Sequence, residues 1–260
     1  MKNLIACFFL LLFISACNSG TDKTEEVALT DTLSYAYDSV KVNSKSTTRV
    51  IDTAKASISF PIFKNDTLNQ FIKRKVFDFF AEEEPATSYQ DIANSFIKGY
   101  EDFLSENPES RQSWFLIIKI NVLKQTPNYL SLKYIHSDYA GGAHGNTNIS
   151  FLNYNPKTNT PITIDSIIQK EKMEALIKVA EDIFRKNEKL TATESLEEKY
   201  FFEKGKFALA QNFHVTDMGL MFLYNPYEIK PYSEGYTELT IPFSALKTIA
   251  KPNTILTTPL

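Results

Sequence analysis

Few side chains in this 260-residue sequence could act as nucleophiles or metal ligands. It has two cysteines, Cys7 and Cys17, and three histidines, His136, His144 and His214. A metal held by His136, Asp138 and His144 would need a tight fold-back, because eight residues of extended strand span about 26 Å. No G-x-S-x-G elbow and no Walker or Rossmann glycine pattern is present. We therefore predict no catalytic residue, no metal site and no cofactor.

A glycine-rich loop is the first candidate for ligand binding. Tyr139 is followed by Ala-Gly-Gly-Ala-His-Gly. Gly141 and Gly142 would leave backbone N–H groups open, and His144 could hydrogen-bond a sugar or a peptide. The alternative is a hairpin turn in which the glycines supply positive φ and the histidine bonds a local carbonyl.

Tyrosines gather in a second candidate segment, between Tyr224 and Tyr236. Tyr227 and Tyr232 could stack on sugar rings or anchor a protein partner, because aromatic side chains bury a large area at low entropic cost. Packing of these rings on a strand face is the alternative. Glu228 could serve as a glycosidase acid only with a second carboxylate at a defined distance, and the sequence alone places none there.

The N-terminus has the pattern of an export signal. Lys2 precedes a ten-residue apolar run, 4–13, which is too short to cross a bilayer core of about 30 Å as a helix. Ile-Ser-Ala-Cys follows and resembles a bacterial lipobox that ends at Cys17. We predict that a signal peptide, 1–16, is removed, that Cys17 is lipidated, and that this lipid anchors the protein to the membrane. An ordinary signal peptide cut near Ala16 is the alternative.

Charge and cysteine content limit which partners the protein could bind and what chemistry it could use. The net charge of −3 argues against nucleic-acid binding, which requires a basic surplus. Removal of 1–16 would take away Cys7 and acylation would use Cys17, which leaves no thiol for catalysis or zinc binding. The small, polar and acidic residues 17–31 are typical of a flexible tether. We predict a lipid-anchored protein of the bacterial cell envelope, at the outer membrane, periplasmic or surface-exposed.

Apolar periodicity predicts an α+β fold with antiparallel sheets, packed helices and two successive subdomains, 32–127 and 128–260. Asp66 is expected to cap the first helix and Ser88 the second. Strands are expected at 33–42, 56–60, 113–124, 130–134, 149–154, 162–164, 213–215, 220–224 and 236–241. Helices are expected at 66–80, 88–104 and 173–184, with a charged helical extension at 194–203 and a closing turn at 242–246.

Two stretches resemble a known family. Residues 139–145 lead into Asn-Tyr-Asn-Pro-Lys-Thr at 153–158, and residues 217–235, with Asn-Pro-Tyr-Glu-Ile-Lys-Pro-Tyr, lead into Thr-Ile-Pro-Phe at 240–243. Together they resemble the PdaC/RsiV-like extracytoplasmic domain, over about 50–255. That domain is the non-catalytic N-terminal part of PdaC-type peptidoglycan deacetylases and the lysozyme-sensing part of RsiV-type anti-sigma factors.

The resemblance implies binding without catalysis. The sequence lacks the Asp and paired His of the deacetylase zinc site. It also lacks the transmembrane helix and cytoplasmic segment of an anti-sigma factor. The expected ligand is a lysozyme-like protein or a peptidoglycan or glycan fragment. Two alternatives stay open: a structural lipoprotein that partners other envelope proteins, or a hydrolase with an unrecognised site. A pocket that contains a His–acid pair would favour the hydrolase.

Overall fold

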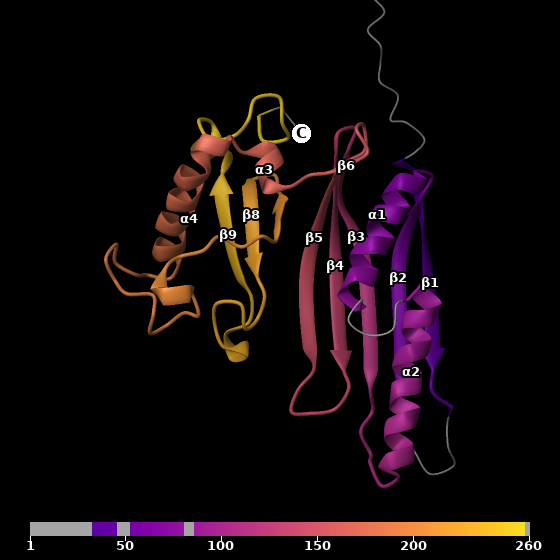
Figure 1. Ribbon diagram of the computed structural model, residues 1–260. Coiled ribbons are helices and arrows are strands. Elements are labelled where there is room, and N and C mark those ends of the chain that lie inside the picture. The colour runs from indigo at the N-terminus through magenta and orange to yellow at the C-terminus, as the bar shows by residue number, and fades with distance from the viewer. Residues whose placement is uncertain (1–32, 46–52, 81–85, 258–260) are drawn as a thin grey trace, which may run out of the picture.

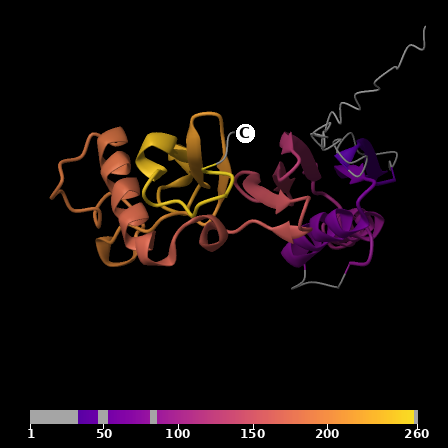
Figure 2. The same ribbon diagram turned by 90° about the horizontal axis from the view of Figure 1, so that it is seen from above.

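The computed structural model describes residues 33–45, 53–80 and 86–257. Two units lie side by side, a six-stranded sheet with two helices and a three-stranded sheet with one long helix (Figure 1). Figure 2 shows the same two units from above. The predicted signal peptide 1–16, the tether 17–31 and Cys17 within it lie outside the described residues. None of the described helices is both long and apolar enough to cross a membrane.

The first unit is one sheet whose strands lie in the order of the chain. Its elements are β1 (Tyr35–Asn43), β2 (Lys55–Phe63), α1 (Asp66–Phe77), α2 (Tyr89–Glu106), β3 (Phe115–Thr126), β4 (Tyr129–Tyr139), β5 (Asn146–Asn155) and β6 (Thr160–Pro161). Neighbouring strands are antiparallel except β2 and β3, which are parallel. The α+β class is confirmed, but antiparallel pairing is wrong for β2 and β3, because α1 and α2 form a crossover between them.

The two helices of this unit form where periodicity and polar caps predict them. Asn65, and not Asp66, caps α1, since its side chain accepts a hydrogen bond from a first-turn backbone N–H. Ser88 caps α2 as predicted. The apolar stripe expected to end with Phe79 and Phe80 is buried only within α1. These two phenylalanines lie in a 3₁₀ turn beyond the helix, and Phe79 is 49% exposed.

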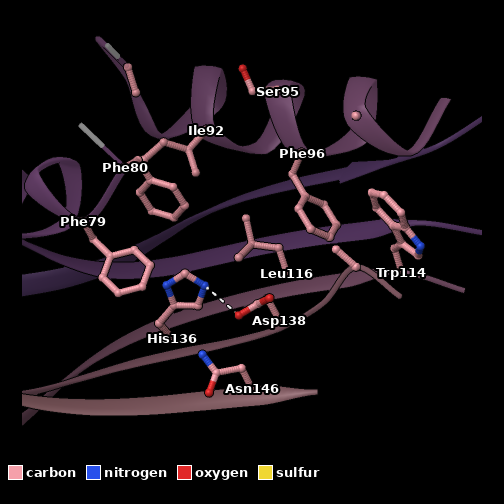
Figure 3. A pocket seen from close by; sticks show the side chains of 13 residues that line it. Phe79, Phe80, Ile92, Ser95, Phe96, Trp114, Leu116, His136, Asp138 and Asn146 are labelled. Atoms are coloured by element: carbon pink, nitrogen blue, oxygen red, sulfur yellow. Dashed lines mark ion pairs between the residues drawn. The ribbon is translucent and has the colours of Figure 1, made fainter. Parts of the chain in front are cut away.

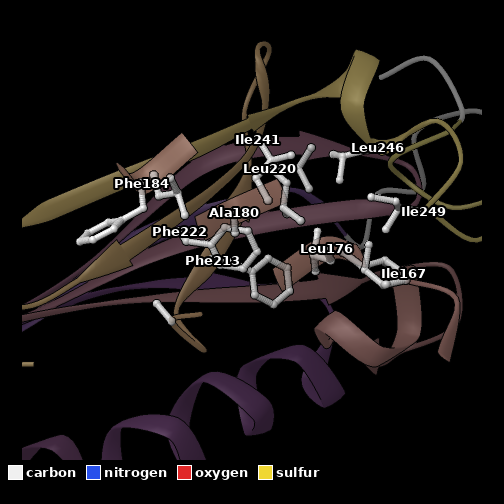
Figure 4. Packing of buried hydrophobic residues seen from close by; sticks show 14 of the residues in the cluster. Ile167, Leu176, Ala180, Phe184, Phe213, Leu220, Phe222, Ile241, Leu246 and Ile249 are labelled. Carbon is white, nitrogen blue, oxygen red and sulfur yellow. The ribbon is translucent and has the colours of Figure 1, made fainter. Parts of the chain in front are cut away.

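The second unit packs α4 against a three-stranded antiparallel sheet. Its elements are α3 (Ile164–Ile167), α4 (Met173–Asn187), β7 (Phe213–Val215), β8 (Gly219–Tyr224), β9 (Thr237–Pro242) and α5 (Phe243–Leu246). Figure 4 shows Leu176, Ala180 and Phe184 of α4 in the core beside residues of the sheet. Gly219 is required at the start of β8, because a Cβ there would lie 2.1 Å from the Ile241 carbonyl oxygen.

Two expected elements of the second unit are wrong. Residues 194–203 form turns instead of a helix, because Tyr200 and Phe202 turn into the core while the Arg185 guanidinium donates to the carbonyl of Glu194 at 2.8 Å. The strand expected at 162–164 is also absent from the structure, because β6 ends at Pro161 and α3 begins at Ile164.

The sheets divide the chain at a different place from the expected subdomains. The boundary between 32–127 and 128–260 falls in the hairpin that joins β3 to β4, and both strands belong to the six-stranded sheet. Hydrogen-bonded pairing continues through β6, so the two units meet after Pro161. The strands expected at 113–124 and 130–134 pair across this turn, so the expected boundary would divide one hairpin.

Two asparagines of the second unit join it to the free edge of β5. Asn225 Oδ1 accepts a hydrogen bond from Ile149 N at 2.7 Å, and Asn225 Nδ2 donates to Ile149 O at 3.1 Å. Asn212 accepts from Phe151 N and donates to Ile149 O, both at 2.7 Å. These amides pair backbone groups that a further strand would otherwise bind. The contact fixes the loop before β5 next to the segment after β8.

Candidate functional site

The glycine-rich loop connects β4 to β5. Gly141 and Gly142 both have φ of +98°, as a tight turn requires. Tyr139 folds back over the loop that follows it, and its hydroxyl donates a hydrogen bond to the Gly142 carbonyl at 3.0 Å. His144 Nδ1 donates to the Gly145 carbonyl at 2.9 Å. The two glycines and Tyr139 therefore shape the loop, and the imidazole of His144 is exposed on it.

Three aromatic rings from distant parts of the sequence meet at this loop. His144 stacks on Tyr232 with ring centroids 4.1 Å apart and planes at 16°. Tyr227 lies 5.6 Å from Tyr232 between centroids, and its hydroxyl lies 3.4 Å from His144 Nε2. The Tyr232 hydroxyl also donates to the Gly145 carbonyl at 3.1 Å. We call His144, Tyr227 and Tyr232 the aromatic patch.

Tyr227 is an exposed ring of the patch and has an unusual backbone conformation. Its side chain is 56% exposed, and its φ is +70°, in the left-handed region that costs a residue with a Cβ about 1 kcal/mol or more. Its N–H donates to the Lys230 carbonyl at 3.0 Å, which closes the turn. The turn therefore presents a large exposed ring at the surface at the cost of local backbone strain.

Polar contacts hold the segment beneath the patch in place. Glu228 Oε1 accepts a hydrogen bond from Asn225 Nδ2 at 3.1 Å, so this carboxylate supports the asparagine that binds β5. Lys230 Nζ lies 2.8 Å from Glu188 Oε1, at the end of α4, and the Tyr200 hydroxyl donates to Glu188 Oε2 at 2.9 Å. Burial and this carboxylate raise the pKa of Tyr200. The patch is therefore held in place by contacts within the second unit and by the asparagine that binds β5 of the first unit.

A second site, which the sequence did not predict, is a cavity of about 480 Å³ between α2 and the sheet (Figure 3). Its walls include four aromatic side chains, Phe79, Phe80, Phe96 and Trp114. The polar lining includes Asp138 and Asn146, which face each other across β4 and β5, and His136. The i, i+2 spacing of His136 and Asp138 on one strand face is the signal that could have revealed it.

His136 and Asp138 form a pair inside this cavity. His136 Nε2 lies 3.2 Å from Asp138 Oδ1, and the imidazole packs on Phe79 and Phe80. His136 is 4% exposed, and its Nδ1 is buried with no hydrogen-bond partner among the described residues. Ser95 lies across the cavity from the imidazole in Figure 3. Because Nε2 contacts the Asp138 carboxylate, Nδ1 is the unpaired nitrogen of the ring, and the pocket contains the His–acid pair that was expected to favour the hydrolase alternative.

His136 and His144, which a metal site would have to bring together, lie apart in the structure. His136 points to the helix-covered face of the sheet, and His144 lies in the patch. Within the described ranges, no group of three or more His, Cys, Asp or Glu side chains is arranged to hold a metal ion.

Comparisons with known proteins show similarity to two described domain families. Residues 48–147 match the family described as deacetylase PdaC, and residues 159–244 match DUF3298, a family of unknown function. One similar curated protein is peptidoglycan-N-acetylmuramic acid deacetylase PdaC of Bacillus subtilis (strain 168), 25% identical over 205 residues. The chain contains a PdaC-like extracytoplasmic domain. The match covers 76% of this chain but only 39% of the relative.

Two solved structures share the fold of the PdaC-like domain together with the DUF3298 region. A DUF3298 family member from Bacteroides fragilis NCTC 9343 superposes with a TM-score of 0.68 at 24% identity, over 87% of this chain and 97% of that one. A DUF3298 family protein from Pseudomonas aeruginosa PAO1 also gives 0.68, at 20% identity, over 89% and 100%. These similarities establish the fold.

The cavity and the aromatic patch can be assigned to the two regions that match known families. The cavity and the loop with His144 belong to the PdaC-like region, and Tyr227 and Tyr232 belong to the DUF3298 region. The aromatic patch thus forms only where the two regions meet. The similarity to PdaC indicates a cell-envelope-associated, extracytoplasmic domain.

Proposed function

We propose that this chain is a lipid-anchored, non-catalytic binding protein of the bacterial cell envelope, with the aromatic patch as its binding surface and a lysozyme-like protein as its ligand. The anchor would be the acylated Cys17, and the relation to PdaC supports the envelope location. The observation that carries the proposal is the convergence of His144, Tyr227 and Tyr232 from segments more than 80 residues apart in the sequence.

The shape of the patch favours a protein ligand over a free glycan fragment. Tyr227 is 56% exposed on a turn, so the patch presents rings outward. Small ligands bind in concave sites, whereas protruding aromatic side chains are typical anchors in protein interfaces. A lysozyme-like protein has a cleft that binds sugar rings, and this cleft can also accept tyrosine side chains. Its basic surface would also be steered toward a chain of net charge −3.

Calorimetric titration of a commercial lysozyme into the purified chain tests this proposal. We expect Tyr227→Ala and Tyr232→Ala each to weaken binding by roughly 10- to 100-fold, as central aromatic anchors do. Tyr35→Ala is the matched control, because Tyr35 is 40% exposed on β1, lies outside the patch, and no hydrogen bond of its hydroxyl is found within the described chain. Muropeptide binding that depends on the same two tyrosines, without lysozyme binding, would make a glycan the ligand. Binding of neither would refute the proposal.

A further inference from the structure

The cavity of the PdaC-like region has the chemistry of a small-molecule site that is separate from the aromatic patch. Its volume, about 480 Å³, falls in the range of roughly 300–1,000 Å³ that is usual for ligand pockets. Phe79 and Phe80 stand at one end and Phe96 and Trp114 at the other (Figure 3). Phe79 is half exposed, so a ligand has a route past its ring.

Asp138 is the one carboxylate among the described lining residues, and no lysine or arginine is among them. Within the described chain, His136 Nε2 contacts one carboxylate oxygen of Asp138 at 3.2 Å. Its side chain is about one-third exposed, and Asn146 lies opposite it on β5. A partly desolvated carboxylate among aromatic walls attracts positive charge and repels anions.

We propose that this cavity binds an organic cation, a protonated or alkylated amine carried on a compact apolar body. The ammonium group would lie against the free oxygen of Asp138, and the apolar body would lie among the phenyl and indole rings. Cations bind over the faces of aromatic rings, and a carboxylate at the same place adds a charge-assisted hydrogen bond. A neutral ligand of the same shape would gain the apolar contacts alone.

Titration by calorimetry or NMR with phenethylammonium and its neutral isostere 2-phenylethanol tests the charge requirement. We expect the ammonium compound to bind at least about tenfold more tightly. Asp138→Asn should remove that preference, and its amide oxygen can still accept from His136, which preserves the fold. Asp165→Asn, the same charge change at an exposed position in α3, should keep the preference. Equal binding of the two compounds to the wild-type chain would overturn the proposal.

Gly99 offers a second variant that fills the cavity without weakening the fold. It lies in α2 among the lining residues, and a Cβ built there has no atom within 4 Å. Leucine is also a better helix former than glycine, by roughly 0.5–1 kcal/mol. Gly99→Leu should therefore abolish phenethylammonium binding while the melting temperature stays equal or rises. Undiminished binding to this variant would show that the ligand lies elsewhere and would overturn the proposal.

Discussion

Asn225 couples the two units, and its removal should weaken both the fold and the patch. The side chain is 5% exposed and makes hydrogen bonds to Ile149 N, Ile149 O and Glu228 Oε1. In Asn225→Ala, Ile149 O keeps its bond from Asn212, but Ile149 N loses its partner at the junction of the units. An unsatisfied backbone group costs about 1–3 kcal/mol when it is buried.

We therefore expect Asn225→Ala to lower the free energy of unfolding by about 1–3 kcal/mol, or the melting temperature by roughly 3–10 °C for a chain of this size. Thermal and urea unfolding followed by circular dichroism measure this change. Asn121→Ala on β3 is the matched control and should stay within about 0.5 kcal/mol of the wild type, because no side-chain hydrogen bond of Asn121 is found within the described chain. Equal stability of both variants would refute the role of Asn225 as the link between units.

Three further results are expected. Gly219→Ala should lower the free energy of unfolding in urea by at least about 2 kcal/mol, because its Cβ would lie 2.1 Å from a carbonyl oxygen. The control Gly99→Ala should raise that free energy by about 0.5–1 kcal/mol. A Gly219→Ala variant as stable as the wild type would contradict the register of β8. Burial lowers the pKa of His214 to about 4 from 6.5, so stability should fall by about 2 kcal/mol between pH 6.5 and 4, where only the unfolded chain gains a proton. His214→Gln should flatten that slope, and an unchanged slope would argue against a buried neutral imidazole. Cys17→Ala should abolish palmitate labelling in cells and release the protein from membranes, and a wild-type chain without label would exclude the anchor.

Local patterns predicted most elements, and the failures have physical causes. The helix at 173–184 was predictable because its apolar residues repeat with the helical period, and α4 is found there. The charged run 194–203 has a similar composition but turns into the core at Tyr200 and Phe202. The parallel pairing of β2 and β3 depends on where a crossover returns the chain, which no local pattern encodes.

The candidate sites divide in the same way. The glycine-rich and tyrosine-rich segments predicted His144, Tyr227 and Tyr232 as candidate binding residues. The contacts of His144 with the two tyrosines depend on how the two units meet, which no local pattern shows. The cavity escaped sequence reasoning because its walls come from α2, β3 and β4 and from the turn after α1. Phe79 and Phe80 were interpreted as core residues of a longer helix, and their place in the cavity wall follows from the end of α1 at Phe77.

Hydrogen–deuterium exchange of the chain with and without a saturating lysozyme tests the central claim most directly. The proposed binding surface predicts joint protection of 139–149 and 224–236, the two segments that form the aromatic patch, and little change along β1 and α1. Protection confined to one segment, or to a face away from His144, Tyr227 and Tyr232, would contradict it.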